Sequence, residues 1–191
     1  MSTKWEGDEY QARFDQLAAE GVDVHGEAAF VLACAPRSVL DAGCGTGRVA
    51  IEIARRGRAV GGIEVVGVDV DASMLATART RAPDLEWIEH DLTTLDLGRT
   101  FQIVVMAGNV PLFTAPGTQR ALIFGCARHV ATDGALVCGF QLGRGYELDA
   151  LDNDCTDAGL ALSERFATWE RAPFRGGVYA VSVHRRTRRS D

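Results

Sequence analysis

The stretch Val39-Leu-Asp-Ala-Gly-Cys-Gly-Thr-Gly-Arg48 decides the fold of this chain. A short apolar strand, predicted at Ser38–Asp41, runs into a glycine-rich turn, and a helix is predicted from about Gly47 to Arg56. In open α/β sheets such a turn lies at the carboxyl end of a strand, where ligands bind. Glycines let the backbone approach a ligand closely, and the start of the helix offers free N–H groups. The stretch therefore predicts an α/β fold with a ligand at this turn.

Strands and helices alternate along the rest of the chain. The further predicted strands cover residues 65–69, 86–89, 101–106 and 135–140. Three further predicted helices cover residues 8–20, 26–35 and 117–130. Another helix follows the second strand, is capped by Asp71 or Ser73, and ends before Pro83. Near-continuous Val and Ile runs between helices are typical of a parallel sheet covered on both faces. Residues 160–170 and 178–186 alternate apolar with polar, so we expect an antiparallel pair at the end.

Composition narrows the classes of function. The chain has 191 residues, of which 47% are hydrophobic and 24% are charged, and this suits a single domain over residues 1–191. Its formal charge of −6 argues against a nucleic-acid partner, which needs a cationic protein surface. The only lysine is Lys4, so the body of the chain has no lysine for a phosphate-binding P-loop or a Schiff base.

Cysteine and histidine spacing predicts no metal site and no disulfide framework. The five cysteines contain no C-x-x-C pair, and the four histidines contain no H-E-x-x-H pair. The N-terminus lacks the apolar run of a signal peptide, and no stretch approaches 18 apolar residues. We therefore expect a reduced, soluble, cytoplasmic protein that stays out of membranes and acts as a monomer or homodimer.

Two details distinguish the glycine turn from the dinucleotide-binding fingerprint G-x-G-x-x-G. Gly43, Gly45 and Gly47 form G-x-G-x-G, and an arginine occupies the position of the third expected glycine. Asp41 precedes the turn, where a carboxylate at the mouth repels a pyrophosphate but suits a positively charged ligand. The alternative interpretation is that Asp41 only caps the turn. Asp69 ends the second strand, 24 residues beyond Gly45, which suits a carboxylate that binds a ribose.

The stretch Asp41-Ala-Gly-Cys-Gly-Thr-Gly47 resembles the first motif of class I S-adenosylmethionine-dependent methyltransferases. The cofactor of that family carries a sulfonium and an ammonium group and no phosphate. The order of elements over residues 35–186 is similar to the family's Rossmann-like, doubly wound, seven-stranded sheet, which is mostly parallel and ends in a C-terminal antiparallel hairpin. The regions expected on this basis are an N-terminal helical cap or lid at 1–35, a cofactor-binding core at 36–140, and a helix with the hairpin at 141–191.

The resemblance also implies the residues of a cofactor site. Asp69 would bind both ribose hydroxyls, Met74 would pack on the adenine face, and Asp91 with the backbone of Leu92 would bind the adenine edge. The family places the methyl group and the substrate at the loop after the fourth strand, here Met106–Phe113. The implied cofactor-binding residues are Asp41, Ala42, Gly43, Cys44, Gly45, Asp69, Val70, Met74, Asp91, Leu92, Met106, Ala107 and Gly108. The alternatives are that the two later acids are turn residues or caps and that Met74 belongs to the core.

No catalytic residue is evident in the sequence, and the reaction of the family explains why. Methyl transfer from a sulfonium is an in-line displacement that depends on alignment and needs no covalent intermediate. A base is required only if the nucleophile starts protonated with a high pKa. Cys44 is interpreted as small packing rather than as a nucleophile. Asn109-Val-Pro-Leu112 departs from the Asn-Pro-Pro-aromatic motif of nucleobase methyltransferases, which disfavours a nucleobase substrate.

Five further residues have a functional and a structural interpretation. Tyr10 and Arg13 lie on a helix that either covers the cofactor or packs as an ordinary amphipathic helix. His25 either supplies a base or starts a helix. Arg144 and Tyr146 follow the fifth strand and either contact substrate or line a solvated turn.

The sequence thus predicts an S-adenosylmethionine-dependent methyltransferase acting on a small-molecule acceptor, because little of the chain lies outside the core sheet. One alternative is a non-catalytic module that binds S-adenosylmethionine or S-adenosylhomocysteine. A second is a nucleotide-dependent oxidoreductase, which the spacing of the turn and Asp41 disfavour. The sequence leaves open the acceptor, the attacked atom and whether the protein turns over.

Overall fold

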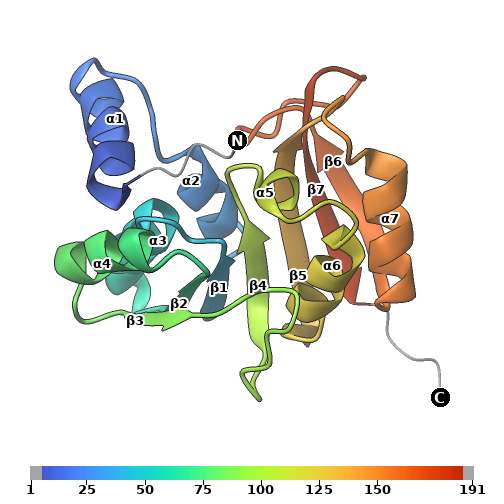
Figure 1. Ribbon diagram of the computed structural model, residues 1–191, viewed down its shortest axis with the longest axis horizontal. Helices are drawn as coiled ribbons and strands as arrows, with labels where there is room; N and C mark the ends of the chain where they lie inside the picture. Colours follow the sequence, from blue (N-terminus) through green and yellow to red (C-terminus); the bar gives the residue numbers. More distant parts are fainter. Residues whose placement is uncertain (1–5, 187–191) are drawn as a thin grey trace.

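The computed structural model describes residues 6–186 and contains a seven-stranded sheet with helices on both faces (Figure 1). The strands are β1 Ser38–Ala42, β2 Glu64–Asp69, β3 Glu86–Glu89, β4 Phe101–Met106, β5 Val130–Gln141, β6 Leu160–Phe166 and β7 Tyr179–Arg186. The helices are α1 Gly7–Ala19, α2 Gly26–Leu32, α3 Arg48–Gly57, the 3-10 helix η1 Arg58–Val60, α4 Ala72–Arg81, α5 Val110–Phe113, α6 Gln119–Ala127 and α7 Leu148–Asp157. Lys4 and the outer ends of the predicted first and last regions lie outside the described residues.

The strands follow the order β3-β2-β1-β4-β5-β7-β6. The first five are parallel, whereas β7 runs antiparallel to both of its neighbours, β5 and β6. This arrangement confirms the predicted doubly wound, mostly parallel sheet with a C-terminal antiparallel hairpin. The strand order reverses beside β1, because β2 lies on one side of it and β4 on the other. An open α/β sheet binds ligands at such a reversal, outside the carboxyl ends of the strands.

Successive residues of the central strands fill two separate cores. Val39 is buried on the face that carries α2, α3 and α4, together with Ile53 and Leu75 from two of those helices. Its neighbour Leu40 is buried on the other face, where α6 contributes Leu122. Burial on both faces explains why these strands appear in the sequence as continuous apolar runs rather than alternating ones.

Several element bounds differ from the sequence prediction, among them the helix predicted at 117–130, which covers Gln119–Ala127. The helix predicted at 26–35 ends at Leu32, because the chain turns there toward β1 through a residue with a left-handed backbone. The fifth strand begins at Val130, because an irregularity in its pairing with β4 accommodates extra residues. The strand predicted at 160–170 ends at Phe166, beyond which the chain turns back toward β7.

The outermost strands of the sheet are short or irregular. β3 has four residues, and β6 shifts register between Leu162 and Glu164 in its pairing with β7. Arg99, in the connection from β3 to β4, pairs with Glu86 (2.6 Å) and with Glu64 (3.3 Å). These ion pairs hold that connection, which contains no helix, against the amino ends of β2 and β3.

α1 packs across α4, in agreement with the amphipathic-helix interpretation. A Cβ atom on Gly7 would stand 2.6 Å from the carbonyl oxygen of Ser73, so the two helices approach closely. The hydroxyl of Thr77 donates a hydrogen bond to Asp8 (2.6 Å). This packing brings α1 beside the glycine turn, on the same side of the molecule as α3 and α4 (Figure 1).

Candidate cofactor site

Three glycines of the turn between β1 and α3 have left-handed backbones, with φ of 79° at Gly43, 53° at Gly45 and 78° at Gly47. A left-handed backbone disfavours any residue with a Cβ atom at these three positions. The atoms that such a Cβ would meet differ from one position to the next. At Gly43 a Cβ atom would stand 2.5 Å from Val110, and at Gly47 it would overlap the ring of Trp87, whereas at Gly45 no atom lies within 4 Å. Packing therefore explains two of the glycines, and the backbone of Gly45 faces open space.

Asp69 lies beside the open part of the turn. Its Oδ2 accepts a hydrogen bond from the backbone N–H of Gly45 (2.7 Å), and its Oδ1 accepts one from the N–H of Asp71 (2.9 Å). Burial raises the pKa of Asp69, although the backbone hydrogen bonds act in the opposite direction. A carboxylate has about four acceptor positions, so this one keeps capacity for a hydroxyl group of a ligand.

Asp41 is buried beneath the turn, with 1% of its surface exposed, so the expectation that it lies at the mouth is wrong. Its Oδ2 accepts a hydrogen bond from the backbone N–H of Ala50 in the first turn of α3 (3.1 Å), which confirms the capping interpretation. Burial raises the pKa of Asp41 to about 7, and the charge of Asp69 acts in the same direction. Because its surface is covered, Asp41 supports the turn and the start of α3 rather than contacting a ligand.

The raised pKa of Asp41 predicts a pH-dependent stability. Between about pH 4 and 7 the folded protein holds a proton that the unfolded chain has lost, so the free energy of unfolding falls as the pH rises through this window. Asp41→Asn removes the titration and keeps the shape. Between pH 5 and 8, urea unfolding should show a decrease that is about 1–3 kcal/mol larger in the wild type than in the variant. Equal decreases would contradict the raised pKa.

The end of β3 lies next to Asp69, since the N–H of His90 donates a hydrogen bond to the carbonyl oxygen of Asp69 (2.9 Å). Asp91 is exposed, and its Oδ1 accepts hydrogen bonds from the N–H and the hydroxyl of Thr93 (2.8 Å each). These hydrogen bonds lower the pKa of Asp91, so the carboxylate is ionised at neutral pH. The turn interpretation of Asp91 is confirmed, and its contact with adenine stays a prediction.

Val70, Met74 and Leu92 differ in how far a ligand can reach them. Val70 follows Asp69 directly and is 67% exposed. Met74 is half-buried in the first turn of α4, which Asp71 caps through hydrogen bonds from the N–H groups of residues 73 and 74. Leu92 is buried in the core on the α6 face. Val70 and Met74 therefore offer side chains to a ligand, and Leu92 offers mainly its backbone.

The loop after β4 borders the site through its backbone. Met106 is fully buried, and its sulfur lies 3.8 Å from the thiol of Cys126 in α6, so this predicted side chain belongs to the core. Gly108 is exposed and has open space at its Cβ position. Asn109 has a left-handed backbone, and its Oδ1 accepts a hydrogen bond from the N–H of Gln141 (2.8 Å). The loop is thereby tied to the carboxyl end of β5.

Ala42, Cys44 and Ala107 are predicted site residues whose side chains pack in the core. Cys44 lies against β2, where a Cβ atom on Gly67 would stand 3.0 Å from its sulfur. Burial raises the pKa of Cys44 well above its usual value, so the thiol stays protonated. These observations confirm that Cys44 is a packing residue.

Glu27 and Arg48 form an ion pair that the sequence alone does not predict. The side chains make two hydrogen bonds, of 2.6 and 2.9 Å, and are 15% and 12% exposed. The guanidinium of Arg48 also lies over the ring of Phe14, 4.6 Å from its centre. The pair thus joins α1, α2 and α3 beside the glycine turn. The sequence feature that could have indicated this ion pair is the arginine directly after the turn.

Gln11 holds α1 against the glycine turn. Its Oε1 accepts hydrogen bonds from the hydroxyl of Thr46 (2.7 Å) and from the guanidinium of Arg81 (2.9 Å). Tyr10 is half-buried against the ring of Phe14, and burial raises the pKa of Tyr10, whereas Arg13 is exposed. α1 therefore lies at the site, and its action as a lid stays a prediction.

His25, Arg144 and Tyr146 have no demonstrated contact with a ligand. His25 directly precedes α2, which confirms the helix-start interpretation, and a role as a base stays a prediction. Arg144 is exposed and donates a hydrogen bond within its own turn (3.0 Å). Tyr146 is 6% exposed and donates a hydrogen bond to Asp154 of α7 (2.8 Å), so both of its predicted roles are wrong and it is a core residue.

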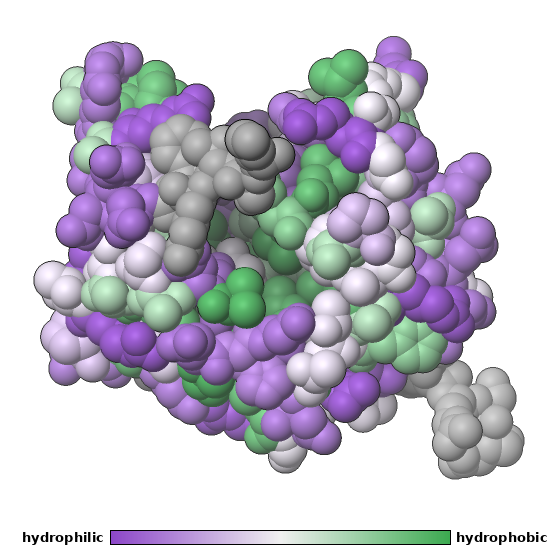
Figure 2. Space-filling view, viewed as in Figure 1, coloured by the Kyte–Doolittle hydropathy of each residue, from purple (hydrophilic) through white to green (hydrophobic). Residues whose placement is uncertain are grey.

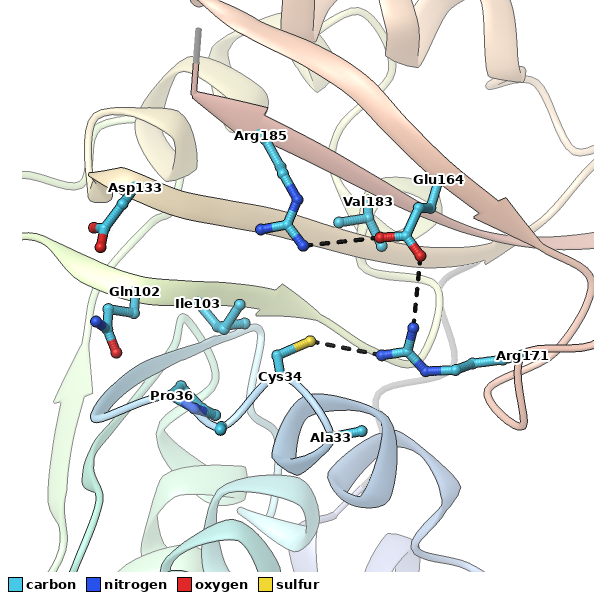
Figure 3. A pocket seen from close by; sticks show the side chains of 11 residues that line it. Ala33, Cys34, Pro36, Gln102, Ile103, Asp133, Glu164, Arg171, Val183 and Arg185 are labelled. Carbon is cyan, nitrogen blue, oxygen red and sulfur yellow. Dashed lines mark hydrogen bonds and ion pairs between the residues drawn. The ribbon is translucent and has the colours of Figure 1, made fainter. Parts of the chain in front are cut away.

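The surface is indented beyond the carboxyl ends of the strands. Figure 2 shows hydrophobic residues in an indentation between α1 and the β6–β7 end of the sheet. A separate cavity of about 360 Å³ lies at the opposite end, beside the start of β4. There Arg171 and Arg185 point toward Glu164, at 3.7 and 3.8 Å (Figure 3). None of the predicted cofactor-binding residues lines this cavity, so it is separate from the candidate cofactor site.

Residues 6–186 contain no cluster of metal ligands, no disulfide and no membrane-spanning helix. Within residues 6–186, no three His, Cys, Asp or Glu side chains gather in a way that could hold a metal ion. The five cysteines are free thiols. None of the helices in the same range is long and apolar enough to cross a membrane.

Comparisons with known proteins agree with this geometry. A sequence model of the family described as "Methyltransferase domain" matches residues 39–134, about half of the chain. The crystal structure of a TehB-like SAM-dependent methyltransferase from Corynebacterium glutamicum is 32% identical, with coverage of 95% of this chain and 98% of that one. The two structures superimpose with a TM-score of 0.86.

Two curated relatives are similar over part of their length. The dTDP-3-amino-3,6-dideoxy-alpha-D-glucopyranose N,N-dimethyltransferase of Streptomyces fradiae is 33% identical over 125 residues, which are 62% of this chain and 47% of the relative. The cypemycin N-terminal methyltransferase of a Streptomyces species is 34% identical over 100 residues, which are 52% and 40%. The chain thus spans less than half the length of these relatives. The matches over its core and over nearly the whole of the solved structure show that this chain belongs to the family of S-adenosylmethionine-dependent methyltransferases.

Proposed function

We propose that this protein transfers a methyl group from S-adenosylmethionine to a small-molecule acceptor. The observation that carries the proposal is the turn between β1 and α3, where Gly45 faces open space and donates a hydrogen bond to Asp69. The same proposal assigns residues 1–35 to a lid, 36–140 to the cofactor-binding core and 141–191 to the closing helix and hairpin. Membership of the family and the methyltransferase names of the relatives support it.

The residues around the turn fit the chemical groups of the cofactor. Asp69 has acceptor capacity for ribose hydroxyls, and its carboxylate suits a ligand that carries a sulfonium and an ammonium group. Val70 and Met74 offer apolar surface to a purine. The ionised carboxylate of Asp91 suits the amino group of that purine.

The protein's own contribution is alignment in a partly dry site. When bound, S-adenosylmethionine would supply the methyl group. A lone pair of the acceptor would form the new bond to the methyl carbon, and the electron pair of the broken C–S bond would remain on sulfur. The backbone at Gly108 and Asn109 would border the place where the two meet, and two hydrogen bonds between Asn109 and β5 hold this loop against the strand end. Holding the reacting atoms close and collinear contributes up to about 7–11 kcal/mol.

Calorimetry tests the cofactor part of the proposal. S-adenosylmethionine and S-adenosylhomocysteine should bind with micromolar dissociation constants, about −8 kcal/mol, because the turn is already formed. NAD(H) should not bind, because the turn has an arginine in place of the third glycine of the dinucleotide fingerprint and a pyrophosphate would meet the carboxylate of Asp69. Binding of NAD(H) and not of the two sulfur nucleotides would overturn the proposal.

An amine is the acceptor class to test first, since two relatives act, by name, on an amino sugar and on a peptide N-terminus. Transfer of a radiolabelled methyl group should be measured to dTDP-3-amino-3,6-dideoxyglucose, to triglycine and to 4-hydroxybenzoate. Product with any of them supports catalysis. Tight cofactor binding without transfer to a broad panel would instead favour a binding module without catalysis.

A further inference from the structure

We propose that Tyr179 positions the methyl acceptor by donating a hydrogen bond from its phenol, and that Trp169 holds Tyr179 in place. The inference rests on the proposed function, because it requires an acceptor at the carboxyl ends of β4 and β5. Trp169 and Tyr179 lie in the last fifth of the chain, far from the glycine turn in sequence.

Tyr179 begins β7 and lies over the end of β5. The indole Nε1 of Trp169 donates a hydrogen bond to the Oη of Tyr179 (3.0 Å). The indole also packs edge-on against Phe30 of α2, with 5.5 Å between the ring centres. Gly139 of β5 makes room for both rings, since a Cβ atom there would stand 2.8 Å from the Tyr179 Oη and closer still to the indole. The carbonyl oxygen of Gly139 accepts a hydrogen bond from the N–H of Asn109 (3.4 Å). The phenol therefore lies above the strand end that holds the β4 loop.

The hydroxyl of Tyr179 keeps its own proton available. One lone pair accepts the hydrogen bond from Trp169, and among residues 6–186 no group accepts the phenol proton. Burial raises the pKa of Tyr179 to about 12, so the group remains a donor at neutral pH. A hydrogen bond accepted from an indole N–H also polarises the O–H bond. Such a phenol suits an oxygen or nitrogen atom beside the attacking atom of the acceptor.

Trp169 connects Tyr179 to the cofactor side of the site through the start of α2. A Cβ atom on Gly26, the residue before Glu27, would stand 3.5 Å from the Cβ of Trp169, and Glu27 forms the ion pair with Arg48. Arg48 starts α3 directly after the turn. Trp169 and Tyr179 thus lie next to the start of α2, which the Glu27–Arg48 ion pair joins to α3 directly after the glycine turn.

The test compares Tyr179→Phe and Trp169→Phe with the wild type in two measurements. The first is binding of dTDP-3-amino-3,6-dideoxyglucose, triglycine and 4-hydroxybenzoate, by ligand-observed NMR, to protein saturated with S-adenosylhomocysteine. The second is methyl transfer to the same probes. Tyr179→Phe should weaken binding of at least one probe and lower its kcat/KM by about tenfold. Trp169→Phe should have a smaller effect, and both variants should bind S-adenosylhomocysteine within twofold of the wild type.

A matched control is Tyr146→Phe, which removes a phenol that is hydrogen-bonded to Asp154 in the opposite core. It should leave probe binding unchanged. If Tyr179→Phe binds and methylates every probe as the wild type does, the positioning role is overturned and the proposed function stands. A wild type that binds S-adenosylhomocysteine but none of the probes also overturns the role, since the panel offers nitrogen and oxygen acceptors. A wild type that binds no S-adenosylhomocysteine overturns the proposed function itself.

Discussion

Asp69→Ala is expected to weaken the binding of S-adenosylmethionine by about 1–3 kcal/mol, because it removes the carboxylate that would accept hydrogen bonds from the ribose. The same change frees the N–H groups of Gly45 and Asp71, so the turn also loses two of its internal hydrogen bonds. Titration calorimetry measures the loss. Urea unfolding of the same sample shows whether the variant is folded.

Two further variants separate the causes of that loss. Asp69→Asn keeps the shape and one acceptor oxygen, so it should lose less affinity than Asp69→Ala. Asp84→Ala removes an exposed acid between α4 and β3 and should leave the affinity unchanged. An unchanged affinity in folded Asp69→Ala would remove Asp69 from the cofactor site.

Gly125→Ala is expected to destabilise the protein by roughly 3 kcal/mol, because it overfills a tightly packed contact. A Cβ atom on Gly125, in α6, would overlap the carbonyl oxygen of Leu92. Alanine favours a helix over glycine by only about 0.5–1 kcal/mol, so the overlap outweighs the gain. Relief of the overlap must shift the backbone next to Asp91, so cofactor affinity should fall as well. Urea unfolding and calorimetry measure the two effects.

Gly26→Ala is the matched control for this substitution. Gly26 also lies in a helix, but the nearest atom to its added Cβ is a carboxylate oxygen of Glu170, at 2.7 Å. That oxygen ends a flexible, exposed side chain and can move away. The stability should therefore change by less than about 0.5 kcal/mol. A similar loss in both variants would show that the contact with Leu92 is not the cause.

The position of Asp69 was predictable because it follows from strand pairing. β1 and β2 are parallel neighbours in which Asp41 pairs with Gly67, so an acid at the end of β2 must meet the turn that follows β1. Local signals named Asp71 or Ser73 as the cap of α4, and the structure shows that Asp71 is the cap. Motifs that depend on adjacent residues and on neighbouring strands can therefore be predicted from a single sequence.

Other features of the site depend on contacts between distant segments. Nothing local shows that Trp87 fills the space beside Gly47 or that Asp41 is covered. The pair of Trp169 with Tyr179 spans the turn between two strands, and it is visible only when β7 is placed beside β5. These residues are typical of what sequence patterns miss, because side chains rather than backbone periodicity bring them together.

The short or irregular outer strands disfavour edge-to-edge pairing between molecules of this protein at high concentration. An exposed strand with a row of unpaired backbone groups is a template for pairing with another chain. β3 offers four residues, and the register shift at Leu162–Glu164 bends β6 and interrupts its ladder. Neither margin of the sheet presents a long, straight edge, so the fold resists the open-ended strand stacking that leads to fibrils.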